Sequence, residues 1–290
     1  MRVAVVGAGA WGSAFAEVMR ERGHDVTLAG RDAPKHEEVA ACELLCVAVP
    51  SKVFREVIAA LPGSAPVLIL TKGLDPASGK RLSRVVPRPD VLMLSGPNHA
   101  EEIAQGLPAA AVLASEDEEL AMSIQHEIHS LRFRIYVNTD LVGVELCAAA
   151  KNVIALAAGA VDGLDAGDNA KAALITRGLA EMARLGEACG ARSETFSGMA
   201  GMGDLMVTCW SRHGRNRRAG ELIARGMSPD DAAAEIGQVV EGLTTAPALR
   251  DLAHRNGVEL PITEAVCEVL SGASLNELVS GLMGRKPTDE

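Results

Sequence analysis

The stretch that decides the fold is residues 3–12, VAVVGAGAWG. Its first four apolar residues predict a buried strand, and the glycines that follow have the spacing Gly-x-Gly-x-x-Gly and precede a helical pattern at residues 11–22. Gly7 permits a tight turn, Gly9 lets the backbone approach a pyrophosphate, and Gly12 lets the helix pack closely on the strand. The start of that helix offers free N–H groups to phosphate. The stretch therefore predicts a dinucleotide site; the alternative is a glycine turn without a ligand.

Up to residue 138, short apolar runs alternate with helical patterns. Runs that are apolar throughout are typical of parallel strands covered on both faces. The alternation predicts an α/β domain of the Rossmann type, with a doubly wound parallel sheet. The expected strands are residues 3–6, 26–29, 44–49, 67–70, 91–94, 110–114 and 134–137, and the expected helices among them are residues 11–22, 52–61 and 116–130.

The pattern changes at residues 138–140, beyond which we find almost no strand-like segment and mainly helical spacing. We therefore expect two domains: a dinucleotide-binding Rossmann domain at residues 1–138 and an all-helical substrate-binding and catalytic domain at residues 139–290. The expected helices of the second domain are residues 141–160, 169–189, 215–225, 228–236, 244–255 and 262–270.

The composition excludes several classes of protein. The 290 residues are 48% hydrophobic and 23% charged, which excludes a disordered chain. A net charge of −10 and an aromatic content of 2% argue against a nucleic-acid partner, because such partners are bound by basic clusters and stacking rings. The six cysteines form no CxxC pair, and His126 and His129 have no third ligand nearby. We expect reduced thiols, no metal and a cytoplasmic location.

The longest weakly apolar stretch, residues 141–164, contains Glu145, Lys151 and Asp162. Charges inside such a run are costly in lipid. We therefore expect a buried helix of a soluble protein and no membrane span. The apolar run at the N-terminus is short and leads directly into a polar helix, so it does not predict a signal peptide.

The second expected strand is followed by Gly30-Arg31. Sites specific for NAD commonly have an acidic residue here, which binds the ribose hydroxyls. A guanidinium can pair with a 2′-phosphate, so Arg31 favours acceptance of NADP. A solvated surface arginine is the alternative. We expect the cofactor to be NAD or NADP, without a choice between the two.

Two further loops follow strands at the edge where open α/β sheets bind their ligands. Lys72 lies in the first, TKG at residues 71–73, and Gly96 and Asn98 lie in the second, SGPNHA at residues 95–100. Both loops are therefore candidates for contact with a substrate.

Lys151 is unusual because it lies in an apolar stretch, CAAAKNVIA at residues 147–155. A cation without a polar face must be paired or have a lowered pKa, and a lysine with a lowered pKa can exchange protons with a hydroxyl group near neutral pH. A lysine that extends to the surface at a domain seam fits the pattern equally well. Asp204, in the loop GMAGMGD at residues 198–204, could hold Lys151 in place; the alternative is an N-cap.

Residues 212–218, RHGRNRR, are basic in an acidic protein. Arginines at a helix start favour a phosphate clamp made by bidentate hydrogen bonds. The alternative, an exposed charged face, suits Arg217 and Arg218 better than Arg215 and Asn216.

Together these motifs resemble one family, the bacterial-type NAD(P)-dependent glycerol-3-phosphate dehydrogenases. The matching pieces follow the family's order along almost the whole chain: GAGAWG, VAVPS, TKGL, SGPNHAEE, AAAKNVIALAAG, GMAGMGDLMVTC, GRNRRAGE and VVEGLTT. The resemblance implies an oxidoreductase that interconverts sn-glycerol 3-phosphate and dihydroxyacetone phosphate with NAD(P), an entry step to phospholipid synthesis.

The resemblance also implies roles for individual residues. Lys151 matches the proton acceptor, and Asp204 is its catalytic partner. The positions that contact the substrate are Lys72, Gly96, Asn98, Lys151, Asp204, Gly214, Arg215 and Asn216. The positions that contact the cofactor, besides Gly7, Gly9 and Gly12, are Ala10, Trp11, Arg31, Lys72, Ala100, Arg215, Val239 and Glu241.

The chain departs from the family pattern in several places. Only residues 32–41 lie between the second strand and the strand that leads into VAVPS, where the family has a longer segment. Ala10 and Gly214 stand where hydroxyl residues are more usual, and Asn98 replaces a serine or threonine. Backbone N–H groups can still serve at positions 10 and 214.

Two other functions fit parts of the pattern. A two-domain dehydrogenase of hydroxy acids shares the Rossmann domain and a lysine base, but TKG and GRNRR favour a substrate with a phosphate. A non-catalytic protein that senses NAD(P) needs no base such as Lys151. We also expect a homodimer, formed through the Ala-rich helical domain.

Overall fold

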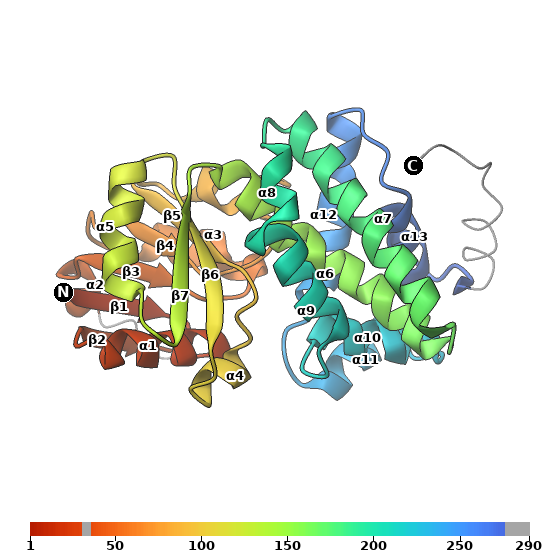
Figure 1. The fold of residues 1–290 in the computed structure, drawn as a ribbon, viewed down its shortest axis with the longest axis horizontal. Helices are drawn as coiled ribbons and strands as arrows, with labels where there is room; N and C mark the ends of the chain where they lie inside the picture. The colour runs from red at the N-terminus through yellow and green to blue at the C-terminus, as the bar shows by residue number, and fades with distance from the viewer. Residues whose placement is uncertain (31–35, 276–290) are drawn as a thin grey trace.

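The structure is a computed structural model that describes residues 1–30 and 36–275. A seven-stranded sheet with flanking helices makes up one half of the molecule, and a bundle of helices makes up the other (Figure 1). The strand order is β2-β1-β3-β4-β5-β6-β7. The chain reverses direction across the sheet between β1 and β3, where dinucleotide-binding folds place their ligand.

The strands are short, and most of their side chains are buried except in the edge strands β2 and β7. Their bounds are β1 Arg2–Val6, β2 Asp25–Ala29, β3 Leu44–Val47, β4 Val67–Ile69, β5 Val91–Ser95, β6 Ala109–Ala114 and β7 Phe133–Asn138. In β3, β4 and β5 every residue is buried, which agrees with strands that are covered by helices on both faces.

The expected all-parallel sheet is correct for β1 to β5 and wrong for the last two strands. β6 runs antiparallel to β5, and β7 runs parallel to β6. The reason lies in the connection at residues 96–108, whose only helix, α4 (Ala100–Ala104), has five residues. A parallel neighbour needs a crossover along the whole length of the sheet. The chain instead re-enters the sheet from the end at which it left.

Helices cover both faces of the sheet, as a doubly wound fold requires. On one face, Phe15 and Met19 of α1 (Ala10–Glu21) and Ile124 of α5 (Glu118–Ile128) pack on alternate strand residues. On the other face, Phe54 and Ile58 of α3 (Ser51–Ala60) pack on the remaining ones. The second of these cores continues without a break into the helical half, so the two halves share apolar packing.

The helical half surrounds one long central helix, α6 (Leu141–Gly163). In the part of the chain described after Asn138, every regular element is helical. The other elements are α7 Gly167–Ala188, α8 Ser193–Ser197, the π-helical turn η2 Met199–Gly203, α9 Asp204–Trp210, α10 Arg215–Ala224, α11 Pro229–Ile236, α12 Glu241–Arg255 and α13 Pro261–Leu270.

Helix α6 is long and apolar enough to span a membrane, but it is a core helix. In its most apolar window, 89% of the residues are buried inside the protein. Its start is fixed by Asp140, whose carboxylate accepts hydrogen bonds from the Gly143 N–H at 2.9 Å, the Arg192 N–H at 2.9 Å and the Thr195 hydroxyl at 2.6 Å. The expectation of a buried helix is confirmed.

Several short elements escaped the sequence analysis. They are α2 His36–Ala40, η1 Leu82–Val85, α4, α8, η2 and α9. Periodicity is a weak signal over one or two turns, because few positions are sampled.

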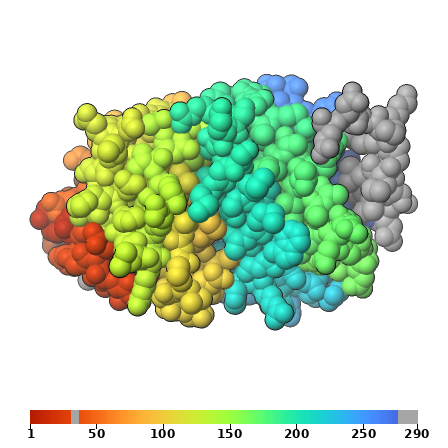
Figure 2. Space-filling model, viewed as in Figure 1, coloured from red at the N-terminus to blue at the C-terminus, as the bar shows by residue number. Residues whose placement is uncertain are grey.

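The seam between the two halves is visible in Figure 2, where the region of α4 meets that of α9 and α10.

Close contact between α6 and α10 depends on glycine. A Cβ atom at Gly159 would lie 1.8 Å from the carbonyl oxygen of Arg217, and a Cβ atom at Gly220 would lie 1.9 Å from that of Leu156.

We predict that Gly159→Ala lowers the free energy of unfolding by about 3 kcal/mol, because the helices must separate. Ala160→Ser, one residue further on, is the control. Urea denaturation measures both; equal stability of the two variants would contradict the packing argument.

Candidate active site

The glycine-rich turn between β1 and α1 has the shape of a phosphate cradle. Gly7 has φ +113°, and a Cβ atom there would lie 2.5 Å from the carbonyl oxygen of Ala48. A Cβ atom at Gly12 would lie 1.9 Å from the carbonyl oxygen of Gly7. At Gly9, by contrast, no atom of the described chain lies within 4 Å of the Cβ position. Gly7 and Gly12 close the turn, and Gly9 leaves an open approach to the N-terminus of α1.

The residues beside this turn fit a dinucleotide. Ala10 begins α1 and is exposed, and no side chain of the described residues caps the helix. Its first N–H groups therefore remain free for phosphate oxygens. Trp11 packs against Phe15 and Phe133 at ring distances of 5.9 and 6.5 Å, yet its buried Nε1–H has no acceptor among the described residues. Arg31 lies outside the described residues.

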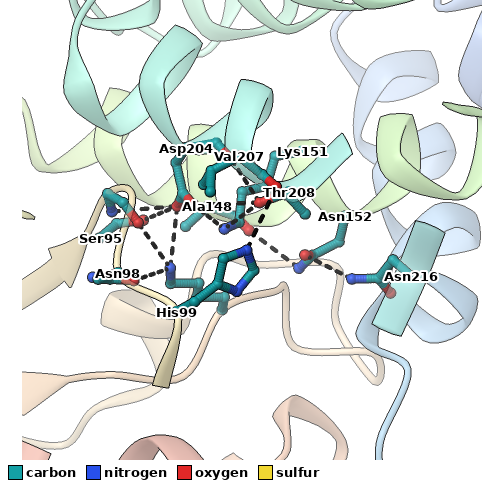
Figure 3. A network of polar contacts seen from close by, with 12 residues as sticks. Ser95, Asn98, His99, Ala148, Lys151, Asn152, Asp204, Val207, Thr208 and Asn216 are labelled. Carbon is teal, nitrogen blue, oxygen red and sulfur yellow. Dashed lines mark hydrogen bonds and ion pairs between the residues drawn. The ribbon is translucent and has the colours of Figure 1, made fainter. Parts of the chain in front are cut away.

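A buried ion pair lies at the centre of the seam between the two halves (Figure 3). Lys151 of α6 donates a short hydrogen bond to Oδ1 of Asp204 at the start of α9, and a second one to the Thr208 hydroxyl at 3.1 Å. Lys151 is 5% exposed and Asp204 is 1% exposed. The interpretation of Lys151 as a lysine that reaches the surface is therefore wrong, and the paired interpretation is correct.

The second oxygen of Asp204 connects the pair to the sheet. Oδ2 accepts hydrogen bonds from Lys72 Nζ at 3.1 Å, the Ser95 hydroxyl at 3.1 Å and the Gly96 N–H at 3.2 Å. Lys72 Nζ also lies 2.9 Å from Oδ1 of Asn98. Residues from the loop after β4, from β5 and its following loop, and from two helices thus meet at one carboxylate, and five of the predicted site residues lie together.

Burial and charge act in opposite directions on this pair. Burial lowers the pKa of Lys151 from 10.5 to about 7; the nearby charge of Lys72 adds to this, and Asp204 opposes it. For Asp204, burial acts to raise the pKa, but the two ammonium groups outweigh it and hold the pKa at about 2. Near neutral pH the carboxylate is ionised, and Lys151 can both take up and release a proton.

Asp204 owes its position to the unusual turn that precedes it. The π-helical turn η2 brings Gly201 so close to Phe196 that a Cβ atom would lie 2.1 Å from that residue's carbonyl oxygen. Gly203 is the N-cap of α9, and Asp204 is its first residue. The alternative interpretation of Asp204 as an N-cap is therefore wrong, because its carboxylate is directed at the lysines.

The loop after β5 presents two polar groups to the seam. Asn98 is 6% exposed, and its Nδ2 has no acceptor among residues 1–30 and 36–275. Burial lowers the pKa of His99, and the charge of Lys151 lowers it further. The imidazole is therefore neutral near pH 7, and the free Asn98 amide is available to an oxygen of a ligand. Ala100, the next residue, begins α4 and is half-buried.

A pair of side-chain amides extends from Asn152, the residue after Lys151, towards α12. Asn216 donates to Oδ1 of Asn152 at 2.9 Å and accepts from the Gly242 N–H at 2.8 Å. Asn216 is 8% exposed, so it lies inside the seam and not on the surface (Figure 3). Gly214, the N-cap of α10, is buried, and a Cβ atom there would lie 2.7 Å from the carbonyl oxygen of Thr208.

In the basic segment, residues 212–218, the exposure of the arginines differs from the expectation. Arg217 was expected to be exposed, but it is 19% exposed and pairs with Asp162 and Glu221. Arg218 is 57% exposed, as expected. Arg215 is exposed too, donates to the carbonyl oxygen of Val239 at 3.2 Å, and lines a polar hollow of about 340 Å³. Its guanidinium is therefore accessible to an anion, whereas that of Arg217 is engaged.

Glu241 connects the helical half to the sheet half. Its carboxylate accepts hydrogen bonds from the Ser51 N–H at 3.1 Å and the Ser51 hydroxyl at 2.5 Å, at the first residue of α3. Burial raises the pKa of Glu241, and the bonds to Ser51 oppose this. The exposed Val239 lies two residues earlier. Glu241 thus lies near the strand edge, where a bound nucleotide was expected.

Four polar residues of this region were not predicted as site residues. Ser95 and Thr208 complete the contacts of Asp204 and Lys151, Asn152 orients Asn216, and Ser51 holds Glu241. Thr208 could have been found, because it lies four residues after Asp204 on a helix and so shares its face. The other three contacts join segments that are far apart in the sequence.

The fold and the buried lysine define a class, the two-domain dehydrogenases that use a nicotinamide cofactor. Within that class, the chain belongs to the NAD-dependent glycerol-3-phosphate dehydrogenase family. Its N-terminal part matches at residues 2–42 and 35–121, and its C-terminal part matches at residues 140–280. The two N-terminal matches overlap at residues 35–42.

Individual proteins support this membership. The glycerol-3-phosphate dehydrogenase (NAD(P)+) of Shouchella clausii is 39% identical over 98% of this chain and 96% of its own length. That of Halorhodospira halophila is 43% identical over 99% of this chain and 98% of its own. The crystal structure of glycerol-3-phosphate dehydrogenase from Coxiella burnetii has a TM-score of 0.91 at 34% identity, with 98% of both chains covered.

The lowered pKa of Lys151 makes a prediction about stability. Its folded pKa of about 7 lies below the ordinary 10.5, so between these values the unfolded chain binds more protons and stability rises with pH. We predict that the stability of the wild type relative to Lys151→Met increases by on the order of 4 kcal/mol from pH 7 to 10.5. Denaturation at several pH values measures it; a constant difference would contradict the buried, shifted amine.

Proposed function

We propose that the chain interconverts sn-glycerol 3-phosphate and dihydroxyacetone phosphate and so supplies glycerol 3-phosphate for phospholipid synthesis. The observation that carries the proposal is the Lys151–Asp204–Lys72 cluster at the carboxyl edge of the sheet. A bound NAD or NADP supplies or accepts the hydride. The residues described above bind the substrate, orient it and move the proton.

Lys151 is the proton carrier. In oxidation, the neutral amine takes the proton from the secondary hydroxyl of glycerol 3-phosphate, and in reduction the ammonium returns a proton to the carbonyl oxygen of dihydroxyacetone phosphate. A pKa of about 7 provides both forms near neutral pH. Asp204 and Thr208 hold the Nζ in place through both states.

The phosphate of the substrate is bound by the basic side of the seam. Arg215 presents an accessible guanidinium at the start of α10, beside the buried Asn216. Lys72 and the free Nδ2 of Asn98 then face the oxygen-bearing carbons. The phosphate thereby provides binding energy that orients the reacting carbon towards Lys151. Gly96 and Gly214 allow the backbone of their loops to approach the substrate closely.

The cofactor is NAD or NADP, held with its pyrophosphate on the turn from Gly7 to Gly12. Ala10 and Trp11, whose Nε1 has no acceptor among the described residues, lie within this turn, and Ala100, Arg215, Val239 and Glu241 provide the further contacts with the cofactor. Arg31, which lies outside the described residues and follows β2 in the sequence, favours acceptance of a 2′-phosphate. We extend the proposal to a division into domains at residues 138–139, a cytoplasmic location and a homodimer formed through the helical domain.

The two alternative functions are less well supported. A hydroxy-acid dehydrogenase needs a cation for a carboxylate, whereas Arg215, Lys72 and Asn98 together supply the cations and the amide that suit a longer, phosphate-bearing substrate. A sensor that only binds NAD(P) has no use for a buried amine with a pKa of about 7. Loss of NADH or NADPH absorbance with dihydroxyacetone phosphate distinguishes all three, since only the proposed function predicts turnover with this substrate.

Lys151→Ala tests the proton carrier. We predict that kcat falls by about a thousandfold, because general acid–base catalysis contributes gains of this order. The dissociation constant for NADH should change little, since the turn from Gly7 to Gly12 is untouched. Lys171→Met, which replaces another buried lysine that pairs with Asp162, is the control. A kcat for Lys151→Ala close to that of the wild type would remove Lys151 from the mechanism.

Arg215→Ala tests the phosphate clamp. We predict that KM for dihydroxyacetone phosphate rises by about 10- to 100-fold, the loss expected for a hydrogen bond between charged groups. Arg225→Ala, at the other end of α10, should leave KM unchanged. Steady-state kinetics measure both variants, and equal wild-type activity on glycerol and on glycerol 3-phosphate would contradict the clamp.

A further inference from the structure

Glu145 is a buried carboxylate that the proposed mechanism does not use. It lies on the second turn of α6, six residues before Lys151, and is 3% exposed. It accepts hydrogen bonds from the Arg81 guanidinium at 2.5 Å, the Ser83 N–H at 2.8 Å and the Ser83 hydroxyl at 2.6 Å. All three donors belong to one segment of the sheet half, so Glu145 fastens that segment to the helix that carries the proposed base.

The fastened segment is the continuation of the loop that carries Lys72. Leu74 and Arg81 form an antiparallel bridge, and the Asp75 N–H donates to the Lys80 carbonyl oxygen at 2.9 Å. The chain therefore folds back on itself directly after Lys72-Gly73. Arg81 is brought beside Leu74, two residues from Lys72, so the anchor on Arg81 also acts on the start of the loop.

Other contacts hold the far side of this loop. Asp75 pairs with Arg55 of α3 at 2.6 Å, and the Gly79 carbonyl oxygen accepts from Arg255 of α12 at 3.3 Å. Neither of these partners lies on α6. Among the contacts described here, the hydrogen bonds of Glu145 join the Lys72 loop directly to α6, the helix of Lys151.

We propose that Glu145 is a positioning residue that keeps the Lys72 loop at a fixed place on α6 and so keeps Lys72 and Lys151 on the two oxygens of Asp204. The inference rests on the proposed function only for the kinetic part of its test. If the anchor is lost, Lys72 moves away from Asp204. Lys151 then loses a neighbouring positive charge and keeps the carboxylate to itself, and both changes favour its protonated form.

The pH readout is specific because few facing groups titrate in the same range. Asp204 has a pKa of about 2, and burial raises the pKa of Cys209 to about 12 and that of Cys147 well above its ordinary value. Burial, and next the charge of Lys151, lower the pKa of His99. Among the described residues, Lys72 is the other charged group that contacts Asp204.

The test compares Glu145→Gln with Glu181→Gln. Glutamine keeps the size of the side chain but removes the charge that pairs with Arg81. Glu181 is a matched control, because it is a 4% exposed carboxylate on α7 that accepts from the Ile262 N–H at 2.6 Å and has no described contact with the Lys72 loop. For Glu145→Gln we expect the acid limb of kcat/KM for glycerol 3-phosphate oxidation to move up by about one pH unit and the rate at pH 7 to fall about fivefold.

A direct titration separates this inference from the proposed function. The ¹⁵Nζ resonance of Lys151, assigned by its loss in Lys151→Met, reports the ionisation of the amine without turnover. The same upward shift in Glu145→Gln supports the positioning role even if dihydroxyacetone phosphate is not a substrate. An unchanged Lys151 titration in a folded Glu145→Gln variant overturns it, and a shift of equal size in Glu181→Gln overturns it as well.

Arg81→Met provides a second route if Glu145→Gln does not fold. Arg81 is 12% exposed and lies at the edge of the loop, so its loss disturbs the core less. It should reproduce the shift, and Arg81→Lys, which keeps a charge for Glu145, should largely restore the wild-type titration. An Arg81→Met variant with a wild-type Lys151 titration and kcat overturns the proposal.

Discussion

The contacts of two lysines with the carboxylate of Asp204 are the interactions on which the rest of the site depends. This carboxylate is almost completely buried, and its two oxygens bind Lys151 from the helical half and Lys72 from the sheet half. A buried charge that loses its partner costs several kcal/mol, so the sheet half cannot hold Lys72 in place without Asp204 of the helical half. The meeting of the two halves at this point is therefore a requirement of the cluster as well as a result of apolar packing along the seam.

The composition of the cluster suits its proposed chemistry. Two ammonium groups around one carboxylate leave an excess of positive charge, which favours an anionic substrate and lowers the proton affinity of the more deeply buried lysine. Burial is the main cause of the lowered pKa of Lys151, and without Lys72 the amine would hold its proton more tightly and be neutral in a smaller fraction of molecules near pH 7. The second lysine thus has two functions, since it contacts Asn98 and also sets the ionisation of its neighbour.

The sequence predicted those features that are local and missed those that depend on tertiary contacts. Gly7 and Gly12 could be assigned because a turn between strand and helix imposes its own steric demand, and Lys151 stood out because its neighbours in the chain are apolar. The orientation of β6 depends on how residues 96–108 cross the edge of the sheet, which periodicity does not encode. The burial of Arg217 likewise depends on Asp162, which lies on a different helix, α6.

Chemical rescue tests the central claim, that a neutral amine at position 151 carries the proton, most directly. Lys151→Ala leaves a space beside Asp204 and Thr208, into which small primary amines can diffuse. If the claim is correct, added methylamine or ethylamine restores turnover of glycerol 3-phosphate in proportion to the concentration of the neutral amine, and the rate depends on the amine's own pKa. A variant that binds NADH and glycerol 3-phosphate normally but shows no rescue by any amine contradicts the claim.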